Sequence, residues 1–558
     1  MSHANAKPLT DFWLGLPEEM KAKLCLGFTG KLHLLNIAEW CLGSGNPAYV
    51  PIGADAIQTA FGENPLDGEM AMELLSHDGV RQILSQDTVD GLTSLAENWN
   101  RPDNTEYFER LLVRRDFAKI KHFLEQSIVK EPDNLFWREH AVSLGFIHND
   151  PDWVEAMIDV ALPAGLAPHK ANVLARINGL RGQCSDSARL SQNVGDTFGP
   201  SFSALRAGLC MLDEGDPASA NLLLLESLNR TPWNTSLLLR VHDLLSGWDT
   251  ALHPLSGSTA ILLSSWNKAI ELDATLRSLL GSELSGVSIF VLDNGSTDST
   301  AEVLRSWQSR FDSRLGLGRF SVITLPVNIG VAAARNWLMH LDDVKRHDFI
   351  CYLDDDVLLP HDWLLRFGTA VRQYPDAGVW GCKEVSHANS VLIQSADNHL
   401  FVDPETLSLD LTRAAPNPFK LSDLHSQSLD TGLQNILRPC ASVAGCCHLF
   451  RTKVLLESGD FAIQLSPVHY EDMEHDLRLC LSGHFAVYQG HLAIRHKKIT
   501  RPASHTSMQE EGNALGNRYK LQTMHDPAAI AAAMAEERQI LGKDLLRKIT
   551  IIERVMVG

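Results

Sequence analysis

Three consecutive carboxylates follow an apolar segment of the chain. Asp354, Asp355 and Asp356 come directly after Phe349–Leu353. Adjacent negative charges repel one another, and burying them costs free energy unless a cation is bound. Hard oxygen ligands suit Mg²⁺ or Mn²⁺, and such an ion also bridges the oxygens of a diphosphate. The same residues are equally well explained as a solvated turn before a helix that includes Trp363–Thr369.

A fourth acidic residue ends an earlier apolar segment. Asp293 follows Val287–Leu292 and precedes Gly295, which permits a tight turn. A carboxylate in this position can accept hydrogen bonds from a base or a ribose. Taken by itself, the segment is also typical of a loop that caps the next helix.

A third segment is suited to an anion. Asn328 and Gly330 form a loop that enters an alanine-rich helix, and Arg335 lies one turn into that helix. Backbone amides at a helix start, together with an arginine, suit the charge of a diphosphate. The alternative is that the small residues Ala332–Ala334 let the helix pack closely on a sheet.

The chain around these segments alternates between short apolar strands and helical patterns. The expected strands are 258–263, 287–292, 322–325 and 349–353, and the expected helices are 271–280, 300–311 and 331–341. This alternation predicts a largely parallel sheet with helices on both faces. Ligands of such sheets bind at the carboxyl ends of the strands, where the acidic residues fall. Ser299 and Glu302 fit a capping box for the second helix.

In this order and spacing, the three segments resemble the inverting family-two glycosyltransferases, which have the GT-A fold. Three later segments extend the resemblance: Ala444–Arg451, His469–Leu479, whose Glu-Asp pair opens a helix, and Ala493–His496, a strand that ends in histidine. The resemblance spans residues 256–500, under half of the chain. It implies a Rossmann-like GT-A α/β catalytic domain with a mostly parallel sheet.

The resemblance also implies roles for individual residues. Asp472 would be the general base that deprotonates the acceptor hydroxyl, with Glu471 beside it. The metal, Mn²⁺ or Mg²⁺, would be bound by Asp354, Asp356 and His496. The expected contacts to the nucleotide sugar are Asn267, Asp293, Asn328, Gly330, Arg335, Asp354 and Asp355.

The implied donor is a nucleoside-diphosphate sugar carrying UDP, GDP or dTDP, and the implied reaction is a single displacement that inverts the anomeric carbon. One departure leaves the nucleobase open, because the family usually has proline or tyrosine before the asparagine, whereas this chain reads Ser264–Asn267. A nucleotidyltransferase can share the sheet topology and the acidic metal site. It usually has a glycine-rich loop after the first strand, and Ser264–Ala269 contains no glycine.

The N-terminal half carries a proline repeat. Prolines recur at nearly constant spacing, and each follows a small or apolar residue by twelve positions. The pairs are Ile120 with Pro132, Ala156 with Pro168, Ala188 with Pro200, and Ala220 with Pro232. A small residue lets two antiparallel helices approach closely, and the proline ends the second helix. The spacing resembles the tetratricopeptide repeat, and the alternative is an ordinary helical bundle with prolines in its loops.

Composition narrows the class of protein. At 558 residues, the chain is too long for one hydrophobic core, so two or three domains are expected. A net charge of −19 argues against binding to a nucleic-acid backbone. We find no run of roughly 18–20 apolar residues that would span a bilayer and no signal-peptide pattern, so we expect a cytoplasmic protein. The ten scattered cysteines predict buried reduced thiols.

The division of the chain bears on the acceptor. We expect a helical region over 1–104, repeats over 105–250, the catalytic domain over 256–500 and a helical extension over 501–558. Segment 384–440 is expected to form part of the acceptor site or a flap over it.

Stacked helical pairs form a concave surface suited to an extended peptide, so we expect a protein acceptor, by analogy a bacterial surface or flagellar protein. The alternatives are a polysaccharide or lipopolysaccharide acceptor, and a non-catalytic scaffold, which the intact carboxylates argue against.

Overall fold

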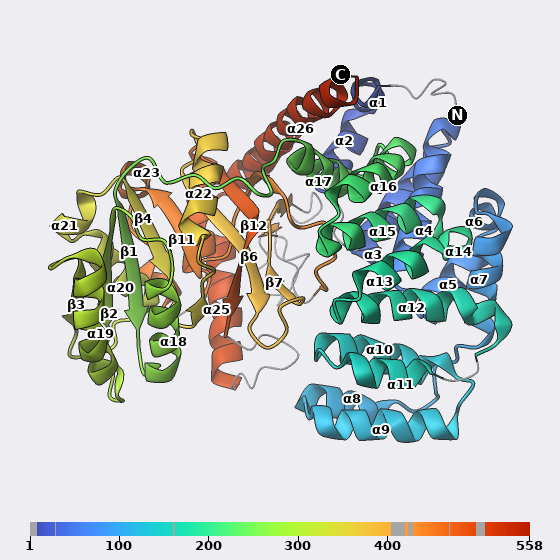
Figure 1. Cartoon of the computed structure of the whole chain (residues 1–558), viewed down its shortest axis with the longest axis horizontal. Helices are drawn as coiled ribbons and strands as arrows, with labels where there is room; N and C mark the ends of the chain where they lie inside the picture. The colour runs from blue at the N-terminus through green and yellow to red at the C-terminus, as the bar shows by residue number, and fades with distance from the viewer. Residues whose placement is uncertain are drawn as a thin grey trace.

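The molecule has a helical half and an α/β half that lie side by side (Figure 1). The computed structural model describes residues 8–27, 30–159, 162–402, 419–421, 428–467, 469–497 and 508–557. Parts of the expected acceptor-side segment 384–440 and the start of the extension 501–558 therefore lie outside the described residues. The predicted order, an all-α region followed by an α/β sheet domain, is confirmed.

Helices α1 to α17 make up the first half of the described chain. Their bounds are α1 (Leu9–Gly15), α2 (Glu18–Leu24), α3 (Lys31–Gly43), α4 (Val50–Glu63), α5 (Gly68–Ser76), α6 (Asp78–Ile83), α7 (Gln86–Glu97), α8 (Glu106–Arg114), α9 (Phe117–Lys130), α10 (Leu135–Ile147), α11 (Pro151–Ile158), α12 (Ala167–Leu180), α13 (Cys184–Gln192), α14 (Gly195–Phe198), α15 (Pro200–Glu214), α16 (Pro217–Arg230) and α17 (Thr235–Leu245). From α8 onward most of them pack as consecutive pairs: α8 with α9, α10 with α11, α12 with α13, and α15 with α16.

The recurrent prolines mark the boundaries between these pairs. Each lies after the second helix of one pair and before, or in the first turn of, a first helix, where the missing amide hydrogen costs nothing. On the second helices Ile120, Ala188 and Ala220 are buried, as a close helix contact requires, whereas Ala156 is exposed. The tetratricopeptide assignment therefore stays a prediction for this helical region.

Glycines let two of these pairs approach closely. A Cβ added to Gly208 of α15 would lie 2.8 Å from Cγ and Cδ2 of Leu224 on α16. A Cβ on Gly145 of α10 would overlap Val154 of α11. By contrast, a Cβ on the exposed Gly179 of α12 would meet only Ser187 Oγ, at an ordinary 3.5 Å.

A mixed sheet forms the core of the α/β half. Its strands are β1 (Thr259–Ser265), β2 (Val287–Asp293), β3 (Phe320–Thr324), β4 (Phe349–Leu353), β5 (Val357–Leu358), β6 (Val379–Ser386), β7 (Ile393–Ser395), β10 (Leu437–Cys440), β11 (Cys447–Arg451) and β12 (Ala486–His496), and a separate pair consists of β8 (Leu400–Val402) and β9 (Phe419–Leu421). The order is β10-β12-β6-β11-β4-β1-β2-β3. Strands β4, β1, β2 and β3 are parallel, as predicted, whereas β11 is antiparallel to both β4 and β6.

Helices cover both faces of this sheet, as expected. Those of the α/β half are α18 (Ala269–Leu280), α19 (Thr300–Leu315), α20 (Val331–Met339), α21 (Asp342–Lys345), α22 (Trp363–Gln373), α23 (Thr452–Ser458) and α24 (Glu471–Leu481). Ile261 and Leu263 of β1 share a core with α18, α19 and α22, while Leu262 shares the other core with α20. The predicted capping box at Ser299 is wrong: Ser299 makes no side-chain cap bond, and Asp298 instead accepts the amide of Thr300.

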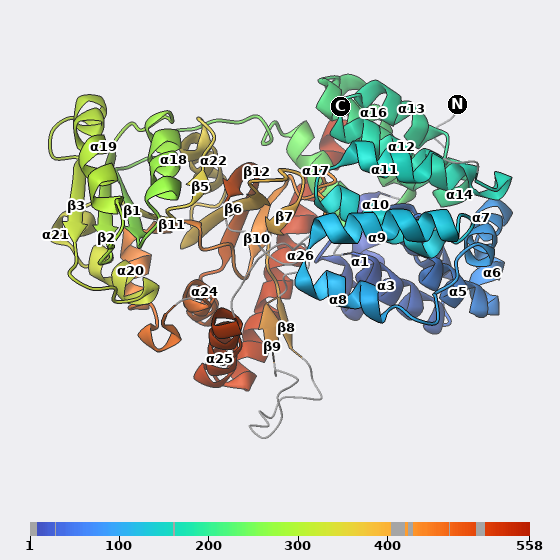
Figure 2. The same cartoon turned by 90° about the horizontal axis from the view of Figure 1, so that it is seen from below.

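The two halves interlock through buried polar contacts. Arg438 of β10 donates to the backbone carbonyls of Cys25 (2.6 Å) and Leu26 (3.0 Å) near the start of the chain. Asp243 of α17 accepts the amide of Leu437 and the ring nitrogen of His491. After α25 (Met508–Met524), the long α26 (Pro527–Val557) packs against α1, α17, β8 and β10, and it runs between the halves (Figure 2). Buried hydrogen bonds to the charged groups of Arg438 and Asp243 are costly to break, so the halves form one unit.

The cysteines and the apolar character of the helices were both subjects of sequence predictions. Every cysteine is buried and takes part in no disulfide, in line with the expected reduced thiols. Within the described residues, none of the helices has the length and apolar character that crossing a membrane requires.

Alanine at two helical glycines should have opposite effects on stability. Both substitutions gain up to about 1 kcal/mol of helix propensity. Gly179→Ala keeps this gain because the site has room, whereas Gly208→Ala pushes Leu224 aside and should lose about 1–3 kcal/mol through overpacking. We expect calorimetry to give a higher melting temperature for Gly179→Ala than for Gly208→Ala, and equal values would contradict the close contact of α15 with α16.

Candidate active site

The three carboxylates lie at the carboxyl end of β4, next to the end of β12. Ligand atoms of Asp354, Asp356 and His496 all lie within 4.8 Å of one another. Nε2 of His496 is 2.9 Å from Oδ1 of Asp356, and both side chains are buried, while the Asp354 side chain is 38% exposed. The structure thus brings together the three residues that the sequence assigned to a metal, although β12 ends 140 residues after Asp356.

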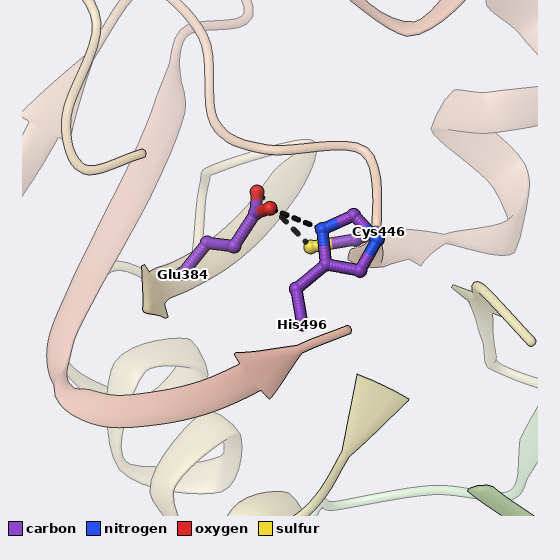
Figure 3. A group of neighbouring side chains, drawn as sticks. All are labelled: Glu384, Cys446 and His496. Atoms are coloured by element: carbon purple, nitrogen blue, oxygen red, sulfur yellow. Dashed lines mark hydrogen bonds and ion pairs between the residues drawn. The ribbon is translucent and has the colours of Figure 1, made fainter. Parts of the chain in front are cut away.

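Glu384, a residue that no sequence motif marks, holds His496 in place and also meets Cys446. Figure 3 shows that the carboxylate of Glu384, on β6, meets both the ring of His496 and the thiol of Cys446. Nδ1 of His496 donates to Glu384, and Sγ of Cys446 lies 3.5 Å from the second carboxylate oxygen. A carboxylate behind a metal-binding histidine fixes its ring orientation and its tautomer. No motif marked Glu384, because its role depends on how β6 pairs with β12.

Charge pairing sets the pKa values of this cluster. Burial alone would lower the pKa of His496, but the adjacent Glu384 and Asp356 raise it to about 10. Burial would raise the pKa of Asp356, yet its hydrogen bond with His496 and the charge of Lys268 hold it well below the usual range. Both groups are therefore ionised near neutral pH.

Asp355 lies away from the metal group, although the sequence analysis gave it a contact to the nucleotide sugar. Its side chain is buried, and Oδ1 lies 3.2 Å from Nζ of Lys268, which also bonds Asp356 at 2.8 Å. Burial raises the pKa of Asp355 to about 6. Its backbone carbonyl accepts the hydroxyl of Thr275, which fixes the turn after β4. Lys268, another residue without a sequence motif, is thus a cation shared by two of the acids.

Arg335 is buried under the site and links its two acidic groups. Its Nη2 donates to the carbonyl of Gly445 and lies 3.5 Å from Asp354, and its Nη1 lies 3.7 Å from Glu471. The guanidinium also packs over the ring of Tyr352. Arg335 thus lies between carboxylates of the chain itself, and its contact to a diphosphate stays a prediction.

Glu471 and Asp472 open helix α24 after a strained turn. The residues before them, His469 and Tyr470, have φ values of 81° and 75°, which are unfavourable for side chains of this size. Burial raises the pKa of Glu471 to about 7, although Arg335 lowers it. Asp472 is only partly buried, and its Oδ2 lies so close to Gly445 that any side chain there would overlap it. Of the two acids, Asp472 is the accessible one.

The remaining predicted nucleotide contacts form a network of loops. Asp293, the last residue of β2, is buried and accepts the amide of Ser296. Asn267 accepts the amide of Thr297, which joins the loops after β1 and β2. Asn328 accepts the amide of Gly330, and the amide of Val331 donates to Pro467. The amides of Gly330 and Val331 are thus engaged within the chain, and anion binding at the start of α20 stays a prediction.

Asn294, which the sequence analysis passed over, completes this network. Its carboxamide accepts the amide of Ile329 and donates to Asn328, each at 3.0 Å. The contacts of Asn267, Asp293, Asn328 and Gly330 to a nucleotide sugar stay predictions.

Residues 260–458 match the family model described as glycosyl transferase family 2. The match covers the ends of β1, β2 and β4 and the acids that follow them. This segment is a glycosyl transferase family 2 domain. The resemblance inferred from the motifs is therefore confirmed for residues 260–458, while Glu471, Asp472 and His496 lie beyond the matched range.

Individual relatives of the transferase domain are distant. The chain is 24% identical over 168 residues to the poly-beta-1,6-N-acetyl-D-glucosamine synthase of Staphylococcus epidermidis, a match that covers 30% of this chain and 35% of that protein. This chain thus spans about a third of the length of that relative.

Two solved glycosyltransferase structures are similar to part of the chain. The crystal structure of GalNAc-T7 with UDP, GalNAc and Mn²⁺ aligns with a TM-score of 0.35 and 14% identity over 49% of this chain and 48% of that one. A mannosyltransferase from Pyrobaculum calidifontis, in complex with GDP-Man and Mn²⁺, aligns with a TM-score of 0.30 and 14% identity over 59% and 85%.

Replacing Glu384 with Gln should lower the pKa of His496. The substitution removes one of the two carboxylates that raise this pKa to about 10, so we expect a fall of about one pH unit or more in the histidine titration followed by NMR. Cys446→Ala, which removes only the neighbouring thiol, is the control and should leave the titration nearly unchanged. An unchanged pKa of His496 in Glu384→Gln would show that Asp356 alone accounts for the raised value.

The same substitution should have a pH-dependent effect on stability. A group whose folded-state pKa is raised stabilises the fold fully below its unfolded value, near 6.5 for histidine, and loses this effect as the pH rises through the folded value. The free energy of unfolding lost in Glu384→Gln, measured by urea titration, should therefore be greatest below about pH 6.5 and decline toward about pH 10.

Proposed function

We propose that this chain is a metal-dependent, inverting glycosyltransferase that moves a sugar from a nucleoside-diphosphate donor to a hydroxyl group of a protein. The family-two domain supports the reaction type. The observation that carries the proposal is the link made by Arg335, which contacts Asp354 of the cation site and Glu471 beside the accessible Asp472. Arg335 thereby links the proposed donor site at Asp354 to the helix start that carries the proposed base, Asp472.

The donor site has the ligands that Mn²⁺ or Mg²⁺ requires. Asp354, Asp356 and His496 offer two carboxylates and an imidazole within one coordination sphere. A cation bound there would offset the negative charge that grows on the leaving diphosphate. Glu384 holds the histidine ring toward Asp356, and Nε2 of His496 would give up its proton to bind the cation.

The nucleotide would lie at the ends of β1 and β2. Ser265 of β1 is paired in register with Asp293 of β2, and the next residue, Trp266, is 50% exposed. Aromatic rings stack on nucleobases, and a carboxylate accepts hydrogen bonds from a base or ribose. Asn267 stabilises the loops that carry both groups, which supports an indirect role in donor binding.

Asp472 is the best-placed base for the acceptor. In a single displacement the acceptor oxygen bonds to the anomeric carbon, the bond from that carbon to the diphosphate breaks with its electron pair, and the hydroxyl proton passes to Asp472. Glu471 is less suited, because it is buried and faces Arg335. The charge of Arg335 stabilises the acids on both sides of the reacting bond.

Asp472→Asn should lose transfer and retain the donor. General-base catalysis typically contributes about 10²–10⁴-fold, so we expect kcat to fall by about that factor while binding of the nucleoside diphosphate stays nearly unchanged. Mass spectrometry of the acceptor measures transfer, and calorimetry measures binding. Asp460→Asn, at an exposed carboxylate paired with His340, is the matched control. Turnover within a few-fold of wild type would exclude Asp472 as the base.

A cavity supports a polypeptide acceptor. Its volume is about 550 Å³, and it lies between α10, α12 and α15 of the helical half and the loop around Leu429–Asn435 of the α/β half. Small residues, among them Ser143, Ala175 and Gly179, line it and leave room for a main chain. This volume is within the range of about 300–1,000 Å³ typical of ligand sites.

The cavity wall carries unsatisfied polar atoms of both kinds. Nη1 of Arg206 and Nε of Arg176 are buried donors without a hydrogen-bond partner, and Oγ1 of Thr431 and Oε1 of Gln434 are buried without one as well. Such atoms are rare unless something binds them. An extended peptide offers carbonyl acceptors and amide donors in alternation, which suits a wall whose residues carry polar groups of both kinds.

The cavity is joined to the catalytic centre by one strand. Lys383 of β6 bonds Asp430 and Asn435 in the cavity wall, and the next residue, Glu384, holds His496. Neighbouring residues of a strand point to opposite faces, so β6 bonds two residues of the cavity wall on one side and the cation site on the other. This arrangement supports a role of the cavity in acceptor binding.

Ser143→Trp should block the cavity without disturbing the donor site. Ser143 is exposed on α10, so the indole can project into the cavity. We expect transfer to the protein acceptor to fall at least about tenfold while slow hydrolysis of the nucleotide sugar persists. Ser143→Ala is the control. Deleting the helical half is a poorer test, because Arg438 would lose its buried partners. Full transfer by Ser143→Trp would favour a polysaccharide acceptor that does not use the cavity.

A further inference from the structure

Lys268 occupies an unusual place for a lysine. It precedes α18, and its Nζ lies 2.8 Å from Oδ2 of Asp356 and 3.2 Å from Oδ1 of Asp355. The two carboxylates are more than nine-tenths buried, whereas the lysine side chain is 43% exposed. A partly solvated ammonium therefore reaches into a buried acidic cluster from outside.

Together with His496, this ammonium occupies both oxygens of Asp356. Oδ1 accepts from His496 and Oδ2 accepts from Lys268. Burial lowers the pKa of Lys268, but the charges of Asp355 and Asp356 raise it well above its ordinary value, so the lysine is charged at neutral pH. In this state the negative charge of Asp356 is already compensated within the chain.

The second cation of the cluster differs from Lys268 in its freedom to move. Arg335 is buried, packs over Tyr352 and donates to the carbonyl of Gly445, so its position is fixed on several sides. Lys268 has a flexible four-carbon stem and solvent on one side, and ordinary rotamer changes can withdraw its ammonium.

We propose that Lys268 is a tethered counter-ion that holds Oδ2 of Asp356 until a divalent cation arrives and then moves off that oxygen. The inference rests on the proposed cation site at Asp354, Asp356 and His496. A divalent ion and an ammonium a few ångströms apart repel each other, and repulsion of this kind is strong in a partly buried site. The lysine thereby stabilises the site without metal and weakens its affinity for metal alone.

Removing the ammonium should therefore tighten metal binding. We expect Lys268→Met to bind Mn²⁺ at least about tenfold more tightly than wild type when no nucleotide is present, because the ion no longer displaces a bound cation. The measurement is the free Mn²⁺ signal in electron paramagnetic resonance during titration of the full-length protein. Lys268→Arg, which keeps the charge, should bind Mn²⁺ no more tightly than wild type.

Two controls separate this mechanism from a general change of charge. Arg495→Met removes an exposed positive charge from the residue next to His496, without contact to Asp356, and should change the affinity by less than about threefold. Lys268→Met combined with Asp356→Asn should lose the tight binding, which locates the ion at this site.

The outcomes also distinguish the inference from the proposed function. If wild type and Lys268→Met bind Mn²⁺ with the same affinity, the lysine is not a competing counter-ion, although the metal site itself stands. If Arg495→Met tightens binding as much as Lys268→Met, the effect is one of net charge and the inference fails. If neither wild type nor Lys268→Met binds Mn²⁺, even with a nucleoside diphosphate, the metal-dependent function and the inference both fail.

Discussion

Charge balance at the carboxyl edge of the sheet is the constraint on which the site depends. Asp355, Asp356 and Glu471 are acids buried where water is largely excluded, with Asp354 partly exposed beside them, and such a cluster costs free energy without compensation. The chain provides the compensation from three directions: Arg335 from below, Lys268 from the loop after β1, and His496 from the end of β12. The loop that carries Lys268 is itself fixed, because the neighbouring Asn267 bonds the loop after β2.

Much of the fold could be predicted from local pattern. The strands at the edge of the site and the helices between them begin and end within a few residues of their expected positions, because apolar runs and turn residues are local signals. Strand direction is a different matter: β11 is an apolar run like β4, and nothing in Cys447–Arg451 marks it as antiparallel. The cap of α19 was misplaced by one residue because Ser299 and Asp298 are both good capping residues, and only tertiary geometry selects between them.

The site could be predicted only as far as its motifs reached. The acids Asp354–Asp356 are recognisable because they follow an apolar strand whose end lies at the ligand edge of the sheet, whereas His496 is predicted only through the resemblance to the family. Glu384 and Lys268 were missed because neither belongs to a recognisable segment; their importance comes from the side chain that lies opposite them. Contacts of this kind depend on packing between distant parts of the chain and have no signature in the linear sequence.

Lys383 and Glu384 are consecutive residues of β6, and their side chains point to opposite faces of the strand. This alternation limits how the protein can change during evolution. Substitutions alter one side chain at a time and leave β6 in register. An insertion or deletion of one residue in β6 would exchange the two faces, turning the acid toward the cavity and the base toward His496. Length variation should therefore be tolerated in the loops around this strand and rejected within it, while the residues that line the cavity remain free to diverge and to accommodate new partners.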